Sequence, residues 1–230
     1  MEQFINSNSI MESRDHSKNA ASQKSLKSKR NIKYFAILIL ILSASTFTSC
    51  YKDGESSKKS GFSSPEEYIE NPSVKKAVNE SDIPVYPGSN PPALAGTYSV
   101  DGSIIDASYE MSSLIGIPVR SVFVLSKQTN SGKIDFEERV NGIKVSGSGG
   151  YISGNSGRFT IYQESIQSGS EAGLPDGVRM TVVLMMSGTK ASNGNLTNVE
   201  GISIVTEINN PSYKKAEGWW WKWKATFYLQ

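Results

Sequence analysis

The sequence predicts an all-β protein, an antiparallel up-and-down meander that closes into a barrel of roughly eight strands. From Ala93 onward, apolar and polar residues alternate with a period of two, and glycine and asparagine turns separate the alternating runs. No stretch of this region carries a helical apolar stripe over three turns. Strands that follow one another through short turns favour a meander, and closing it into a barrel leaves no exposed strand edge.

The expected strands follow these alternating runs. They are Gly96 to Val100, Ser103 to Met111, Pro118 to Lys127, Lys133 to Val140, Ile143 to Ile152, Arg158 to Gln167, Val178 to Gly188, Leu196 to Ile208 and Trp219 to Leu229. Asn141-Gly142 is the strongest hairpin signal, because both residues tolerate the positive φ angles of a type I′ turn. Further turns are expected at Asn155-Ser156-Gly157, Pro175-Asp176-Gly177 and Asn193-Gly194.

The alternation also assigns faces. On the last strand the core face is expected to carry Trp221, Trp223, Ala225, Phe227 and Leu229, and the opposite face Trp220, Lys222, Lys224, Thr226 and Tyr228. On the strand expected from Lys133 to Val140, one face carries Ile134, Phe136 and Val140. The opposite face carries Asp135, Glu137 and Arg139. Met180 to Met186 is apolar on both faces, which predicts a covered central strand or a second apolar layer.

Two short helices are expected before the barrel. Ser64 can cap the first, Pro65 suits its first position and Glu67 completes a capping box. Asn71-Pro72 interrupts it. The second helix is expected from Pro72 to Glu80, with a face of Val74, Ala77 and Val78. The proline-rich stretch from Ser81 to Pro92 is expected to be extended and to mark a domain boundary.

The region from Lys33 to Cys50 has the parts of a secretory signal: a basic edge, a short apolar run and small residues. The apolar run from Phe35 to Phe47 is shorter than the ~20 residues of a permanent membrane span. The start of the chain is open between Met1 and Met11. An uncleaved N-terminal helix, or a core segment with a buried thiol, are the alternatives.

Phe47-Thr48-Ser49-Cys50 resembles the lipobox of bacterial lipoproteins, although leucine is commonest where Phe47 stands. The resemblance implies a signal peptide over residues 1–49, acyl chains such as palmitate on Cys50, and anchoring to a membrane of the cell envelope, with the outer membrane or cell surface favoured. Residues 50–92 then form a lipidated tether with short helical segments, and residues 93–230 form the barrel domain. Lys52-Asp53 partly resembles surface-routing signals; a solvated linker is the alternative.

Cleavage before Cys50 would leave 230 − 49 = 181 residues with 24 − 7 = 17 basic and 22 − 3 = 19 acidic groups, a net charge of −2. That balance excludes nucleic acid as a partner. The single cysteine excludes an intramolecular disulfide, so the core alone must stabilise an exported fold.

A second resemblance appears at the first strand, in Pro91-Pro92-Ala93-Leu94-Ala95-Gly96-Thr97-Tyr98. A double proline followed by Gly-x-Tyr resembles a group of uncharacterised bacterial envelope lipoproteins with a lipocalin-like β domain, and the Gly-x-aromatic opening is similar to the lipocalin Gly-x-Trp. The resemblance implies a barrel with a ligand-holding interior. Two features depart from it: Tyr98 replaces tryptophan, and no C-terminal helix is recognisable.

Most catalytic chemistry is excluded. His16 is the only histidine and lies in the leader, and Cys50 would be consumed by lipid, so histidine triads, cysteine proteolysis and histidine zinc sites are ruled out. The glycines Gly147, Gly149 and Gly150 lack the ending of a phosphate loop and are interpreted as a bend in a curved strand.

The remaining carboxylates are poorly placed for acid–base work. Asp135 and Glu137 share a face, but Arg139 continues it and would keep at least one of them ionised. Asp101 and Asp106 lie near a turn without the ligand pattern of a calcium loop. We therefore expect no catalytic residue, no metal and no cofactor, and the chain is not expected to be an enzyme.

Two functions remain: an envelope-anchored β domain that acts as a binding or interaction module, and a lipocalin-like carrier of a small apolar ligand inside the barrel. Aromatic faces can bind apolar, glycan or protein ligands, and the residues predicted for this role are Trp219, Trp220, Trp221, Trp223 and Tyr228. Burial in the core is the competing interpretation for the tryptophans. A cavity lined by Trp221, Trp223, Phe159, Ile161 and Met180 would favour the carrier, and a filled interior the interaction module.

Overall fold

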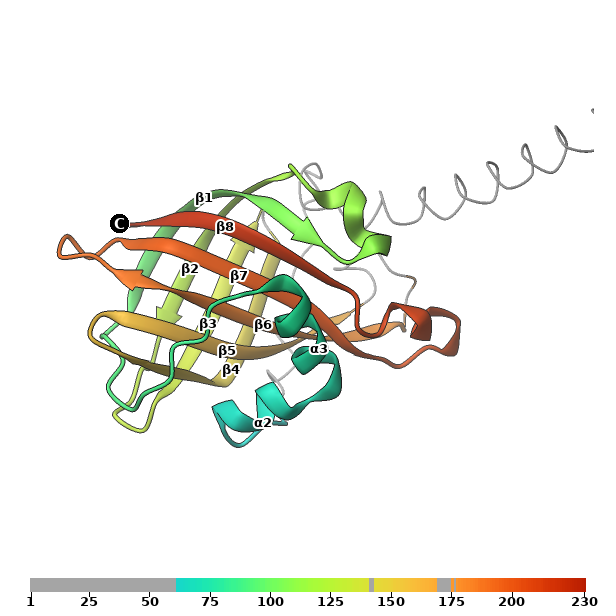
Figure 1. The fold of residues 1–230 in the computed structure, drawn as a ribbon, viewed down its shortest axis with the longest axis horizontal. Helices are drawn as coiled ribbons and strands as arrows, with labels where there is room; N and C mark the ends of the chain where they lie inside the picture. The colour runs from blue at the N-terminus through green and yellow to red at the C-terminus, as the bar shows by residue number, and fades with distance from the viewer. Residues whose placement is uncertain (1–60, 141–142, 169–174, 176) are drawn as a thin grey trace, which may run out of the picture. The chain divides into compact units, whose positions relative to one another are not determined.

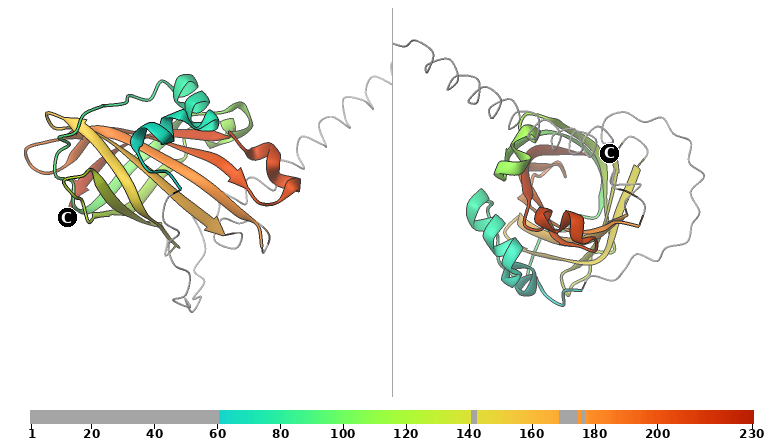
Figure 2. Two further views of the ribbon diagram at one scale, coloured as in Figure 1. Left: turned by 90° about the horizontal axis from the view of Figure 1, so that it is seen from below. Right: turned by 90° about the vertical axis from the view of Figure 1, so that its right-hand side faces the viewer.

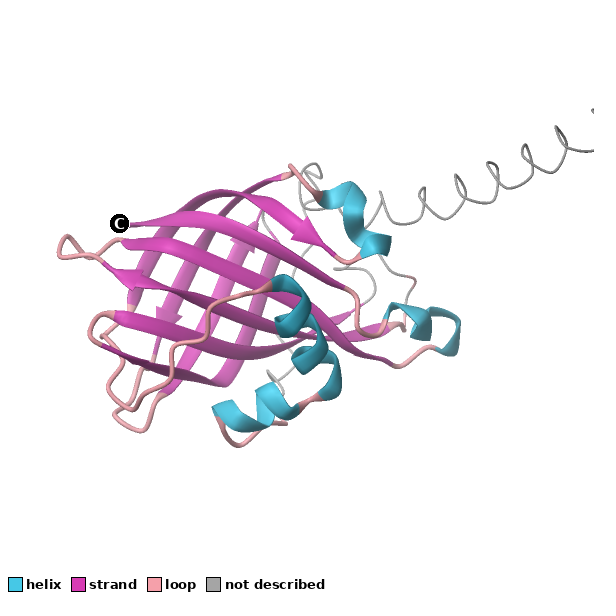
Figure 3. Cartoon of the chain, in the orientation of Figure 1, coloured by secondary structure: helices cyan, strands magenta, loops and turns pink. Residues whose placement is uncertain are grey.

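The computed structural model describes residues 61–140, 143–168, 175 and 177–230, and these form a single barrel with helices on its outside (Figures 1 and 3). The eight strands are β1 (Gly96–Ala107), β2 (Pro118–Ser126), β3 (Lys133–Val140), β4 (Ile143–Asn155), β5 (Arg158–Ser168), β6 (Arg179–Lys190), β7 (Leu196–Ile208) and β8 (Trp220–Leu229). The helical elements are α2 (Pro65–Glu70), α3 (Pro72–Ser81) and the 3₁₀ turns η1 (Tyr109–Leu114) and η2 (Pro211–Ala216).

Every strand pairs antiparallel with the next along the chain, and β8 pairs with β1, so the sheet is closed. Figure 2 shows the strands as a ring in its right-hand view. The predicted all-β meander is therefore confirmed, together with its strand number and the short helices before it.

The two strands expected at 96–100 and 103–111 form the single strand β1, which ends at Ala107. Gly102 lies inside this strand. A side chain at Gly102 would collide with Ala225 and with the carbonyl of Lys224 on β8, so glycine allows the two strands to approach closely.

The hairpin turns follow the chemistry of their residues. Between β4 and β5, Ser156 and Gly157 have φ angles of 53° and 82°, the positive values of a type I′ turn. Strands β3 and β4 pair as predicted, with Val140 opposite Ile143. The turn residues Asn141-Gly142 and residue Asp176 lie outside the described part of the chain.

Helices α2 and α3 begin where their capping residues predict. Ser64 accepts a hydrogen bond from the amide of Glu67 at 3.4 Å, and the Asn71 side chain accepts from the amides of Ser73 and Val74. The capping box differs in one respect. The carboxylate of Glu67 accepts from the amide of Ser63 rather than from that of Ser64.

The two helices cover part of the outer surface of the barrel, as Figure 2 shows in its left-hand view. Tyr68, Val74 and Ala77 are fully buried there against outward-facing residues of the sheet. The sheet contributes Tyr151, Tyr162, Val183, Met185, Ile202, Ile204 and Trp220 to this cluster. The strand with two apolar faces thus meets a second apolar layer, as predicted from Met180 to Met186.

One end of the interior is filled by large side chains, and we call this end the packed half. The rings of Phe123, Phe136, Trp223 and Phe227 lie with centroids 5.0 to 6.4 Å apart. Trp223 packs directly on Gly201, where a Cβ atom would overlap the indole ring. Other buried members are Tyr98, Leu125, Ile134, Ile152, Phe159, Ile161, Met186, Leu196 and Val199.

The opposite end carries the connections that follow the odd-numbered strands. In an antiparallel meander these connections all lie at one end, and η1 and η2 lie there in Figure 1. Ala216 of η2 packs with Val178, Met180, Val182, Val205 and Ile208, and the partly buried Tyr213, Trp219 and Trp221 complete this cluster.

Candidate binding site inside the barrel

Strand β3 places one carboxylic acid on the inner face of the barrel, Glu138. Ile134, Phe136 and Val140 are the buried residues of this face, and Glu138 falls between them in the alternation. Its register partner on β2 is Phe123, a member of the packed half. Because residues opposite each other in a ladder point to the same side, the Glu138 side chain faces the interior.

The surroundings of Glu138 disfavour its charge. Burial raises the pKa of this carboxyl from 4.5 to about 7, and contact with the Ser121 hydroxyl opposes the shift. No cation of the described residues forms an ion pair with it. Glu138 nevertheless keeps part of its surface accessible, which a carboxyl that faces an internal space would show.

Two further buried polar atoms of the interior form no hydrogen bond of ordinary geometry. Gln163 on β5 is completely buried, its Nε2 donates to the carbonyl of Glu164 at 3.1 Å, and its Oε1 has no hydrogen-bond partner. The Ser121 Oγ is also buried and forms no hydrogen bond of ordinary geometry. An orphaned buried acceptor is costly, so such groups call for a ligand or an ordered water.

Gly147 and Gly150 make room for Gln163, because a Cβ at either position would overlap its side-chain amide. Gly149 has a φ of 71°, and the register between β3 and β4 shifts at this point. The glycine cluster is therefore the strand irregularity that the sequence predicted. It also creates the space for a polar side chain inside the barrel, which the sequence did not reveal.

Around Glu138 several residues of the inner face are not fully buried, although Met180, Val182 and Val205 pack with η2, and we call this end the open half. Several side chains there that share the inner face in the register remain partly accessible. They are Val119, Ser121, Glu138, Val145, Gln167, Ser203 and Trp221. The interior is thus divided into a packed half and an open half with polar groups.

A shallow depression of about 450 Å³ lies next to Ser121, at the point where the pairing of β2 with its neighbours changes. Strand β2 pairs with β1 from Pro118 onward, but its pairing with β3 begins only at Val122. The depression is lined by Val100, Asp101, Arg120, Ser121, Val122 and Arg139. It connects the outer surface of β1 to β3 with the residue that contacts Glu138.

The charged residues of this outer surface are paired with one another. Arg120 binds Asp101 at 3.3 Å, and Glu137 binds Arg139 at 2.6 Å and Lys144 at 2.7 Å. Hydrogen bonds from Lys144 and Arg139 hold the pKa of Glu137 below its usual value. Glu137 and Glu138 are neighbours in sequence, yet their pKa values shift in opposite directions because they face opposite sides of the sheet.

Asp135 also lies on the outer face, where it binds Lys127 at 2.8 Å and accepts a hydrogen bond from the amide of Gly149. Asp135 and Glu137 therefore share a face, as the sequence predicted. Within the described residues, no group of three or more histidine, cysteine or acidic side chains is arranged to hold a metal ion.

The predicted aromatic residues do not form one site. Trp223 belongs to the packed half, Trp219 and Trp221 pack beside η2, and Tyr228 is 49% exposed on the outer face. Trp220 faces outward, as the alternation predicted, but α3 buries it. The five residues that were expected to line a carrier cavity do not line one. Phe159, Ile161, Met180 and Trp223 are buried, and only Trp221 is partly accessible.

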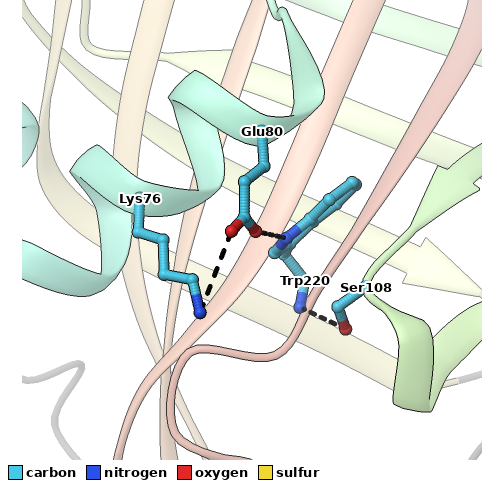
Figure 4. Close-up of polar contacts among 4 residues, drawn as sticks. All are labelled: Lys76, Glu80, Ser108 and Trp220. Atoms are coloured by element: carbon cyan, nitrogen blue, oxygen red, sulfur yellow. Dashed lines mark hydrogen bonds and ion pairs between the residues drawn. The ribbon is translucent and has the colours of Figure 1, made fainter.

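Trp220 joins α3 to the barrel, as Figure 4 shows. Its indole N–H donates to Glu80 at 3.1 Å, and Glu80 lies 3.8 Å from the ammonium of Lys76. The backbone amide of Trp220 donates to the Ser108 hydroxyl at 3.4 Å. These contacts are within the protein, so the placement of Trp220 favours a structural role.

The neighbouring Lys222 strengthens the same attachment. Its ammonium donates to the carbonyl of Ser81 at the end of α3 at 3.0 Å and binds Glu200 at 2.8 Å, beneath the helix. A cation at a helix C-terminus satisfies free carbonyls and interacts favourably with the helix dipole. The sequence placed Lys222 on the outer face correctly but showed no reason for its burial.

Glu138 is the residue that the sequence analysis missed. The run Ile134, Phe136, Glu138, Val140 puts an acid on an otherwise apolar face, and this interruption was the available signal. What the pattern did not contain is the space around Glu138, since that space depends on side chains from distant strands.

Comparisons of the chain with protein families, with curated proteins and with solved structures found no match. Among the described residues, no helix is both long enough and apolar enough to cross a bilayer. Cys50 and the preceding apolar run lie outside the described residues. The site inside the barrel therefore has to be interpreted from its own geometry.

Proposed function

We propose that the chain is an exported lipoprotein of the cell envelope, anchored through lipid on Cys50, and that its barrel is a binding module for a small ligand. The single observation that supports binding in the interior is the open half, where partly accessible side chains surround Glu138 while the packed half supplies stability. Small-molecule sites combine apolar walls with a few polar groups of this kind.

The ligand is expected to be small, with an apolar part. Leu184, Val145 and Trp221 offer apolar surface on the inner face, and Ser121 and Gln163 offer polar atoms without partners. The packed half leaves no room for a long acyl chain along the whole barrel. This is a narrower role than that of a lipocalin that encloses a ligand through most of its interior.

Anchoring is supported by the residue pattern that ends at Cys50. One acyl chain binds a membrane only marginally, at about 0.8 kcal/mol per buried methylene, so stable anchoring needs the two or three chains of a bacterial lipoprotein. Mass spectrometry of the mature protein should find Cys50 as an acylated N-terminus, and Cys50→Ala should release the protein or leave its precursor uncleaved. Unchanged membrane fractionation without lipid on Cys50 would contradict the proposal.

Binding in the interior is tested with the fluorescent apolar dye N-phenyl-1-naphthylamine and the lipid-free mature chain. Val145→Trp places an indole beside Glu138 in the open half and should abolish the fluorescence increase of the dye. Lys144→Trp adds the same indole to the outer face one residue earlier and should leave dye binding unchanged. Equal binding by both variants, each checked by thermal melting, would place the dye outside the barrel.

A protein partner is a second candidate, favoured by exposed apolar residues beside η1. Tyr109 is 90% exposed, and Ile105 and Ile115 are 42% and 49% exposed on either side of it. Exposed apolar clusters of this kind mark interaction surfaces. If this end is a docking surface, Tyr109→Ser should leave dye binding and folding intact and weaken association with envelope proteins in cross-linking experiments.

A further inference from the structure

We propose that the open half recognises a small ligand through a protonated amine, which the carboxylate of Glu138 binds inside the barrel. This inference rests on the proposed binding function and adds the chemical class of the ligand. It follows from the kinds of polar atoms that face the interior and from the charges that are missing there.

The open half is rich in hydrogen-bond acceptors. Glu138 offers two carboxyl oxygens, and the Oε1 of Gln163 has no partner. The amide nitrogen of Gln163 already donates to Glu164, so the Ser121 hydroxyl is the remaining donor among these groups. An ammonium supplies three donors and no acceptor, which matches this set.

Among the residues that the structure describes, no positive charge on the inner face competes for Glu138. The described residues that share its face in the open half are Gly102, Ile104, Ala107, Val119, Ser121, Val140, Val145, Gln163, Ser165, Gln167, Met180, Val182, Leu184, Ser203, Val205, Ile208 and Trp221. None of these is ionisable. The nearest arginines along the sheet, Arg120 and Arg139, face outward and are paired with Asp101 and Glu137.

A buried carboxylate without a cation is unstable, and a ligand cation would provide the missing partner. The same arrangement disfavours anions, because a ligand carboxylate would be repelled by the carboxylate of Glu138 and would find one donor, the Ser121 hydroxyl. Fatty acids and other anionic lipids are therefore disfavoured. The apolar walls formed by Leu184, Val145 and Trp221 suit the remainder of a short aliphatic or aromatic amine.

The depression next to Ser121 lies on the outer surface beside the site. Ser121 lines the depression and also contacts Glu138, so one residue separates this surface from the carboxyl.

The experiment uses three probes that share one ring and differ in charge: benzylamine, benzyl alcohol and benzoate. Isothermal titration of the purified lipidated protein in detergent, with a detergent blank, measures each affinity at pH 8. Benzylamine should bind about tenfold or more tightly than benzyl alcohol, as expected for a hydrogen-bonded charge pair, and benzoate should bind more weakly than either.

Glu138→Gln keeps the shape of the side chain and removes its charge. It should lower the affinity for benzylamine by about tenfold or more and change that for benzyl alcohol by less than about twofold. Glu137→Gln, the matched control on the outer face, should change neither. Because the empty site has its pKa at about 7, the affinity for benzylamine should rise with pH below 7 and level off above it.

The outcomes separate the two proposals. If benzyl alcohol and benzylamine bind equally well and Glu138→Gln has no effect on their ratio, the inference about the amine is overturned while the binding function stands. Tighter binding of benzoate overturns it as well. If none of the probes binds and the dye of the preceding section does not bind either, the proposed binding function itself fails.

Discussion

The packed half and the open half of the barrel are built by the same eight strands, yet their interiors differ. In the packed half, Phe123 and Trp223 are almost fully buried and stack with other aromatic rings. In the open half, their neighbours along the same strands, Ser121 and Trp221, remain partly accessible. Two residues along a strand thus separate a side chain that stabilises the fold from one that is available to a ligand.

The residues that stabilise the fold and those proposed to bind a ligand therefore lie at opposite ends of the barrel. Buried aromatic residues supply apolar burial at one end, so the other end can tolerate an isolated carboxyl and unpartnered polar groups. Proteins commonly keep such locally unfavourable groups where they bind ligands, because the rest of the fold offsets the cost.

The largest effect is expected from truncation in the packed half. Trp223→Ala should lower the free energy of unfolding by roughly 3 to 5 kcal/mol, since it removes a buried indole that packs on Gly201 and on two phenyl rings. Trp221→Ala, on the same face in the open half, should cost less than half as much. Urea denaturation of both variants measures the difference, and equal losses would mean that the two halves are packed alike.

The next largest effect is expected where α3 packs on the outside of the barrel. Trp220→Phe should cost roughly 1 to 2 kcal/mol, because it removes the hydrogen bond to Glu80 and part of the apolar contact with α3. The alternation placed Trp220 on the outer face with Lys222 and Lys224, where a truncation would cost little, but burial under the helix raises the expected cost. Hydrogen exchange should accelerate in α3 and leave β1 protected; a variant as stable as the wild type would show that the helix adds little.

The same layer bears on the domain boundary. The prediction that residues 51–92 are dispensable and that residues 93–230 fold alone stays a prediction. Because Tyr68, Val74 and Ala77 cover apolar residues of the sheet, we expect the fragment from Ala93 to keep the barrel but to melt earlier. The sequence predicts that limited proteolysis cuts first between Tyr51 and Pro92, and loss of cooperative melting in the fragment would mean that the helices belong to the folding unit.

A smaller and pH-dependent effect is expected from Glu138. Its folded-state pKa of about 7 lies above the ordinary 4.5, so the folded protein binds the proton more tightly and stability declines as the pH rises from 4.5 through 7. Glu138→Gln should remove this decline, which amounts to roughly 3 kcal/mol at most. Thermal melting from pH 4 to 8 measures it.

Glu137 is the control for that experiment. Its pKa is lowered by Lys144 and Arg139, so its stabilising contribution is present above pH 4.5 and lost as the pH falls through the lowered pKa. Glu137→Gln should therefore leave the decline between pH 4.5 and 7 in place. If the two glutamine variants gave the same pH profile, Glu138 would not face the interior.

The smallest effect is expected at Tyr228, which is 49% exposed on the outer face far from α3 in the strand. Tyr228→Ser should change stability by less than about 0.5 kcal/mol, as most surface substitutions do. It should also leave dye and benzylamine binding unchanged. A loss of binding would return Tyr228 to the site that the sequence predicted.

The sequence by itself determined the barrel, its order of strands and the side of the sheet on which most residues lie. Alternation and turn chemistry depend on neighbouring residues, so they can be predicted from the sequence. Trp223 and Phe227 face inward and Lys222 and Lys224 outward, and Ser64 and Asn71 cap the helices that follow them. Only the tertiary structure decided what covers each face. Trp220 is buried because a helix from a distant part of the chain lies over it, and Glu138 is partly accessible and has no ion-pair partner because of the side chains that distant strands place around it. Periodicity along one strand contains neither fact, since both depend on the volumes and positions of residues far away in sequence.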